Sequence, residues 1–230
     1  MTDRDTQTAA YWGEAFEIEE SDLDEATALK ARARRMYLRA RGYALRGLEL
    51  RDPRFGEEIR RSPKEAVAAA RAEDVPFLYW AAASWGLAIS LSKDDPELVA
   101  DLPAVEAMID RALELDEDYG QGAIHSFLIS YDQSRPGIAN GEERARAHFA
   151  RVVQLSAGQL AAPYVTLAES VSVARQNRAE FDSLLEQALA INPDSRPASR
   201  LENILAQRRA RWLLDHADDL ILSSEGESDE

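Results

Sequence analysis

The first regular spacing of apolar and small residues lies between Asp22 and Leu50. Its intervals alternate between three and four residues, which places all members on one face of an α-helix. We therefore predict a helix over about 22–50, roughly 40 Å long, that packs one face against a neighbour. Small residues recur there every seventh position, which would let a neighbouring helix approach closely. The predicted face comprises Ala26, Leu29, Ala33, Met36, Ala40, Tyr43, Gly47 and Leu50.

A second feature is a run of 18 uncharged residues from Val75 to Ser92. This length is at the lower edge of what a transmembrane helix needs. Its alanines and serines keep the hydropathy modest, however, and Asp74 and Lys93 close the two ends. We interpret the run as a buried helix at the centre of the fold or beside a cavity, because a helix that is apolar on all sides needs cover.

Proline and acidic first turns mark the other helix boundaries. Ser62-Pro63 and Asp95-Pro96 each combine an N-cap residue with proline at the first helical position, where its missing N–H costs nothing. No segment shows the period-two alternation of strands. The sequence therefore predicts an all-α fold, with further helices near 63–72, 76–91, 103–115, 122–132, 141–156, 163–176, 178–191 and 197–222.

Similar helix endings suggest an internal repeat. The ending Ala188–Pro193 resembles that of a tetratricopeptide repeat, and related endings occur at 47–50, 112–116 and 152–156. Short loops favour antiparallel neighbours. We expect a stack of antiparallel helical hairpins, built from degenerate tetratricopeptide-like repeats. The expected organisation is a single domain over 11–222, between disordered segments at 1–10 and 223–230.

Composition narrows the possible chemistry. The chain has no cysteine, which excludes disulfides, thiolate metal sites and cysteine nucleophiles. It has 42 acidic and 27 basic residues, a formal net charge of −15, so it lacks the excess of cations that nucleic-acid binding requires. Part of this charge is local, because residues 14–25 hold seven acids and the tail 223–230 holds four.

Patterns for catalysis or metal binding are absent from the sequence. It has no glycine-rich phosphate loop, no H-E-x-x-H and no G-x-S-x-G. His125, His148 and His216 lie in three separate predicted helices without the spacing of metal ligands. We therefore predict a protein that is not an enzyme and that uses no cofactor or metal.

The candidate binding groups are aromatic residues and one histidine. His125 lies in an otherwise apolar helix, either as a core histidine bonded to a neighbour or as a polar group in a ligand cavity. The aromatic residues fit either core packing or an aromatic-lined cleft. They are Phe77, Tyr79, Trp80 and Trp85 on one predicted helix, followed by Tyr119, Phe127 and Tyr131.

Several segments together resemble the T component of TRAP transporters, the TatT family. The resemblance covers about residues 11–222. The segments that carry it are Arg34–Arg41, Leu78–Leu91, Lys93–Pro96, Arg111–Gly120 and Ala206–Leu214.

This resemblance implies a non-enzymatic accessory protein of a tripartite ATP-independent periplasmic (TRAP) uptake system. Its implied partner is the periplasmic solute-binding P component, its implied assembly a trimer, and its body would hold a small organic or apolar ligand in a cavity. Motif position makes Tyr79, Trp80, Ser84 and Trp85 the cavity candidates. The physical argument above adds His125 and Tyr131.

Localisation is expected to be periplasmic, with a lipid anchor, if the chain follows the family. Family members usually carry a signal segment and a lipobox cysteine before the part that matches Tyr11 onward. The chain as given shows neither, so it is expected to be cytoplasmic if Met1 is the true start. The alternative function is a general tetratricopeptide-like scaffold that binds other proteins.

Overall fold

The computed structural model describes residues 14–15, 17–19, 21–135, 137 and 139–222. Within these ranges every regular element is a helix, which confirms the all-α prediction. The repeat arrangement stays a prediction, and the disorder expected at 1–10 and 223–230 lies outside the described residues. The chain divides into two compact units, Met1–Tyr119 and Gly120–Glu230, and each is described by itself. The single domain expected over 11–222 also stays a prediction.

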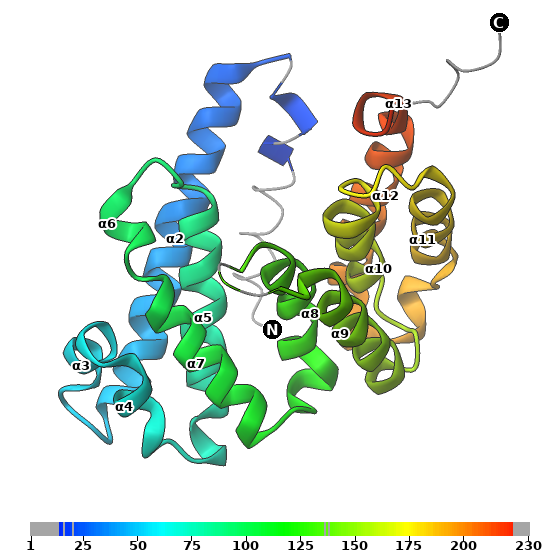
Figure 1. The fold of residues 1–230 in the computed structure, drawn as a ribbon. Coiled ribbons are helices and arrows are strands. Elements are labelled where there is room, and N and C mark those ends of the chain that lie inside the picture. The colour runs from blue at the N-terminus through cyan, green and yellow to red at the C-terminus, as the bar shows by residue number, and fades with distance from the viewer. Residues whose placement is uncertain (1–13, 16, 20, 136, 138, 223–230) are drawn as a thin grey trace, which may run out of the picture. The chain divides into compact units, whose positions relative to one another are not determined.

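The first unit is organised around one central helix, α5. It packs against α2 on one side and α7 on the other, while α3 and α4 also contact α7 (Figure 1). The short helix α3 was not predicted from the sequence, whereas α6 begins at the predicted start Asp95-Pro96. The helices are α2 (Leu23–Glu49), α3 (Phe55–Arg61), α4 (Pro63–Ala68), α5 (Val75–Ser90), α6 (Pro96–Val99) and α7 (Leu102–Leu115), with a 3₁₀ turn at Ala72–Asp74.

Helix α5 is the buried helix that the uncharged run predicts. Leu78 and Trp85 are fully buried, and so are most of the alanines between and after them. Small side chains let α2 and α7 approach α5 closely, while the large ones fill the space between. No helix in the described part of the chain is both long and apolar enough to cross a membrane.

The buried face of α2 differs from the predicted one. Tyr43 is 52% exposed and Leu50 87% exposed, whereas Tyr37, Ala44 and Leu48 are buried instead. The buried positions of α2 follow each other at steps of seven and four, close to 3.6 residues per turn. The predicted series had a period of 3.5, which drifts about 20° per heptad around a straight helix. Over the length of α2 that drift turns the last members outward.

Most predicted helix starts are confirmed in position, although the helix predicted from 197 begins at Arg200 after a 3₁₀ turn, and only part of the predicted capping is confirmed. Asp95 accepts a hydrogen bond from the Leu98 N–H at 3.2 Å, as expected of an N-cap. Ser62 and Asn140 occupy N-cap positions without a side-chain hydrogen bond. At the start of α2, Asp22 accepts from the Glu25 N–H at 2.9 Å.

The second unit centres on α11, which packs against α10, the π-helical turn and α12 (Figure 1). Its core contains the fully buried Phe181, Leu185 and Leu213. The predicted helix at 197–222 is divided at His216, and the one at 163–176 passes into a π-helical turn. The elements are α8 (Tyr119–Ser134), α9 (Gly141–Ser156), α10 (Ala162–Leu167), the π turn Ala168–Ser172, α11 (Arg178–Ala190), α12 (Arg200–Asp215) and α13 (Ala217–Leu220), with 3₁₀ turns at Pro193–Ser195 and Pro197–Ser199.

The start of α8 is a left-handed turn of three residues. Gly120, Gln121 and Gly122 all have positive φ, at 58°, 61° and 91°. A Cβ on Gly122 would lie 3.0 Å from Cγ2 of Val152 in α9 and 3.2 Å from its Cα. Glycine is therefore needed here both for the backbone conformation and for the close approach of α8 to α9.

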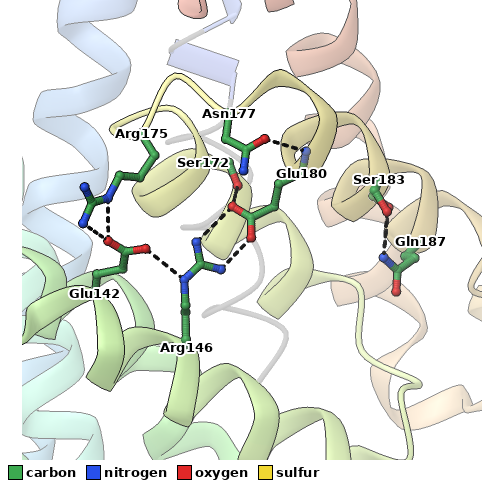
Figure 2. A network of polar contacts seen from close by, with 8 residues as sticks. All are labelled: Glu142, Arg146, Ser172, Arg175, Asn177, Glu180, Ser183 and Gln187. Atoms are coloured by element: carbon green, nitrogen blue, oxygen red, sulfur yellow. Dashed lines mark hydrogen bonds and ion pairs between the residues drawn. The ribbon is translucent and has the colours of Figure 1, made fainter.

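A polar network joins α9 to the π turn and to α11 (Figure 2). Arg146 donates to both carboxylate oxygens of Glu180, at 2.5 and 3.1 Å, and to Glu142 at 3.0 Å. Glu180 also accepts from the Ser172 hydroxyl at 2.8 Å, and Glu142 accepts from Arg175. The bond from Arg146 lowers the pKa of Glu180, against the opposing effect of burial. These contacts hold three elements together at the surface of the second unit.

Candidate functional site

Tyr79 and Trp80 form an aromatic cluster with Tyr119 at the end of the first unit. The Tyr79 ring lies 5.0 Å from that of Trp80, edge to face, and 5.4 Å from that of Tyr119. All three side chains are partly exposed. Burial raises the pKa of Tyr119, and the Trp80 indole offsets part of that rise. The cluster offers an aromatic surface that water reaches, which suits an apolar contact.

Ser84 lies one turn after Trp80 and is 3% exposed. Its hydroxyl donates to the Trp80 carbonyl oxygen at 2.5 Å and lies 3.3 Å from that of Ala81. The hydroxyl proton is thus used within the helix, as serine hydroxyls in helices often are. A role of Ser84 in a cavity stays a prediction.

Trp85 is fully buried beneath two arginines of the first unit. The guanidinium carbon of Arg41, from α2, lies 4.5 Å from the ring centroid, and that of Arg60, from α3, lies 5.2 Å away. Two cations therefore share one indole, an arrangement in which each attracts the ring and repels the other.

His125 takes part in a buried chain of three polar side chains in the second unit. Its Nδ1 lies 2.8 Å from Nδ1 of His148, and Nε2 of His148 lies 3.3 Å from Oδ2 of Asp132. If the ionised Asp132 accepts from Nε2 of a neutral His148, the Nδ1 of His148 must accept from His125. Asp132, whose side chain is fully buried, also accepts from Arg144 at 2.7 Å. His125 is thus buried and bonded to a neighbour, and a role in a ligand cavity stays a prediction.

Tyr131 packs on the outside of the same helix. Its ring stacks on Phe127 at 5.3 Å, and the Arg135 guanidinium lies 5.9 Å from it. The six candidates therefore divide into four in the first unit and two in the second. In the ranges that the structure describes, no three His, Asp or Glu side chains are grouped to hold a metal ion.

The sequence did not single out Arg41, Arg60, His148 and Asp132, which the structure places against the candidates. His148 lies in a different helix from His125, yet the packing of α9 on α8 brings the two ring centroids to 5.0 Å. Asp132 follows His125 by seven residues, a spacing that puts both on one face of α8. No sequence signal marks the two arginines, because their contact with Trp85 depends on how α2, α3 and α5 pack.

Known proteins are similar to this chain over most of its length. Residues 8–221 match the family described as TRAP transporter T-component. Over 210 residues the chain is 30% identical to an uncharacterized protein of Treponema pallidum (strain Nichols). That alignment covers 89% of this chain but 65% of the relative, so the chain spans less than two thirds of its length. The chain belongs to the TRAP transporter T-component family.

Proposed function

We propose that this protein is the accessory component that docks the solute-binding P component of a TRAP uptake system outside the cytoplasm. The observation that carries the proposal is the family match over nearly the whole chain. In the same proposal the protein assembles as a trimer and holds a small organic or apolar ligand. The aromatic cluster of Tyr79, Trp80 and Tyr119 supports ligand binding, because apolar ligands bind well against partly exposed rings.

An exposed apolar face on the first unit supports the docking role. Phe77 of α5, 40% exposed, lies directly over Gly47 of α2. Tyr43 and Leu50 lie one turn before and after Gly47 and so continue the same face, which we call the α2 patch. The guanidinium carbon of Arg46 lies 4.4 Å from the Tyr43 ring. An aromatic and aliphatic centre edged by arginine is typical of the core of a protein–protein interface.

The test measures direct binding between the purified chain and the solute-binding protein of the same transporter. Light scattering or sedimentation gives the mass of the complex and of this protein alone. We expect a complex at micromolar concentration and a mass of three chains for this protein alone. Leu50→Asp should weaken the complex by roughly tenfold or more, because it places a charge inside a dry interface.

The matched control is Leu201→Asp, at a leucine of α12 that is 45% exposed. It introduces the same charge on the other unit and should leave binding unchanged. A docking role would be abandoned if no complex formed at high micromolar concentration. Equal effects of the two substitutions would leave docking intact but remove the α2 patch as its surface.

A further inference from the structure

The arginines above Trp85 line a pocket of the first unit, outside the aromatic cluster of Tyr79, Trp80 and Tyr119. An open depression of about 380 Å³ lies in the first unit, where α2, α3 and the segment around α6 meet. Arg41 and Arg60 line it, and Leu38 and Leu98 supply its apolar part. The indole of Trp85 lies beneath both guanidinium groups.

The acidic residues of this pocket are largely engaged with other partners. Asp95 caps α6 through one carboxylate oxygen and pairs with Arg34 through the other, at 2.6 Å. Asp101 pairs with Arg60 at 3.3 Å. Glu97, the third acid, is on the exposed rim. Arg34 and Arg60 therefore have carboxylate partners, and Arg41 is the cation that remains.

Arg41 has no direct ion-pair partner among the residues that the structure describes. Its guanidinium forms no ion pair there, and its buried Nε has no hydrogen-bond partner. Burial lowers the pKa of Arg41, and Arg60 lowers it further, although Asp101 acts in the opposite direction. A buried donor without an acceptor and two neighbouring cations each cost free energy, which an anion bound beside them would offset.

The Arg41 guanidinium has the shape and charge to bind an oxyanion. Its N–H groups lie along the edges of the planar group, and its central carbon lies 4.5 Å from the Trp85 ring centroid. Trp85 itself offers no acceptor. Carboxylates and phosphates accept two parallel N–H bonds from such an edge, which gives the strongest kind of neutralising contact.

We propose that this pocket binds a small oxyanion, a carboxylate or a phosphate group, with Arg41 as its principal anchor and Arg60 as the second cation. Leu38 and Leu98 would contact an apolar body attached to the anion. The proposal deepens the ligand-holding part of the proposed function. Its test uses this chain alone, so failure to bind a solute-binding protein would leave it unaffected.

The experiment is a titration of the full chain with benzoate and, separately, with inorganic phosphate at low ionic strength. Binding is followed by the NMR signals of the Trp85 indole N–H, assigned with Trp85→Phe, and of the Arg41 Nε–H. We expect saturable shifts of both signals with at least one anion, and weaker binding at high salt because the pocket is open to solvent. Benzoate binding identifies a carboxylate with an apolar body, whereas binding of phosphate alone identifies a phosphate group.

Three variants make the result specific. Arg41→Gln should weaken binding by roughly tenfold or more, and Arg41→Lys by less, because lysine keeps the charge but loses the planar pair of donors. Arg35→Gln is the control, since Arg35 is an exposed arginine of the same helix outside the pocket. Thermal unfolding of each variant confirms that it is folded.

Two results would overturn the proposal. One is the absence of saturable shifts with either anion up to about 20 mM, an affinity too weak for a specific site. The other is binding that does not depend on the anion or on Arg41. That outcome would appear as equal affinity for benzamide and benzoate, or as equal affinity of Arg41→Gln and the unmodified chain.

Discussion

At the scale of single residues, Asp132 is a buried carboxylate of the second unit that is bonded to two basic side chains. Its side chain is fully buried and carries bonds from Arg144 and His148. Burial raises the pKa of its carboxyl group, but the bonds from His148 and Arg144 outweigh that effect, so the pKa lies below its ordinary value. A carboxylate in this position stabilises the fold only while it remains ionised.

Replacing the Asp132 carboxylate should therefore lower the free energy of unfolding by an amount that depends on pH. Asp132→Asn is expected to reduce the free energy of unfolding by about 2 kcal/mol at neutral pH, because Arg144 and His148 lose their charged acceptor. A depressed folded-state pKa contributes stability that is present above the unfolded value of about 3.9 and is lost as pH falls through the folded value. The difference between the two proteins should therefore shrink below about pH 4, as measured by urea unfolding.

The comparison variant is Asp182→Asn. Asp182 pairs with Arg178 at 2.9 Å, but both side chains are more than one third exposed. An exposed pair contributes about 0–1 kcal/mol, so this change should have little effect at any pH. If Asp132→Asn and Asp182→Asn lowered the free energy of unfolding equally, Asp132 would not stabilise the fold more than an exposed carboxylate does.

At the scale of elements, α2 shows how a helix selects its buried face. Its buried positions keep the 3.6-residue period of a straight helix, and the face containing Tyr43 and Leu50 is exposed. Gly47 still serves the close approach that the sequence predicted. The partner at this position is the Phe77 ring of α5, whose Cδ1 would lie 2.3 Å from a Cβ on residue 47.

Two glycines of α2 give a matched pair of substitutions. Gly42→Ala should stabilise the protein by about 0.5–1 kcal/mol through helix propensity, because the nearest atom to its new Cβ is the end of the Arg46 side chain at 3.6 Å. Gly47→Ala should instead destabilise it by about 1 kcal/mol, because the Phe77 ring must move. Thermal unfolding measures both.

The double variant Gly47→Ala with Phe77→Ala tests the cause. Removing the ring removes the clash, so the alanine at position 47 should then be favourable relative to Phe77→Ala alone. A Gly47→Ala change that remained unfavourable without the ring would show that Phe77 is not the reason for glycine.

At the scale of the whole molecule, each of the two compact units has its own buried residues. The first is built around α5, with Leu78 fully buried, and the second around α11, with Leu185 fully buried. Separate cores give each unit the means to open without the other.

Leu78→Ala and Leu185→Ala are therefore expected to act locally. Each should cost about 2–5 kcal/mol as a cavity in a packed core. In hydrogen exchange followed by mass spectrometry, the first should accelerate exchange of amides in residues 21–119, and the second in residues 120–222. Equal acceleration of both units by either substitution would show that the chain opens as one cooperative body.

The sequence by itself determined the helical class, most helix starts and the burial of α5. These depend on neighbours within one or two turns, such as Asp95 before Pro96 or the uncharged run from Val75. The resemblance in its motifs also predicted the family to which the chain belongs.

Only the tertiary structure decided which side chains meet. Two of these contacts join different helices: His125 lies against His148, and Arg41 lies over Trp85. The exposure of Tyr43 depends on how α2 is rotated about its own axis. Periodicity fixes a helix face only to within the drift between 3.5 and 3.6 residues per turn. The contacts that form the candidate sites depend on how those faces pack, which no local pattern records.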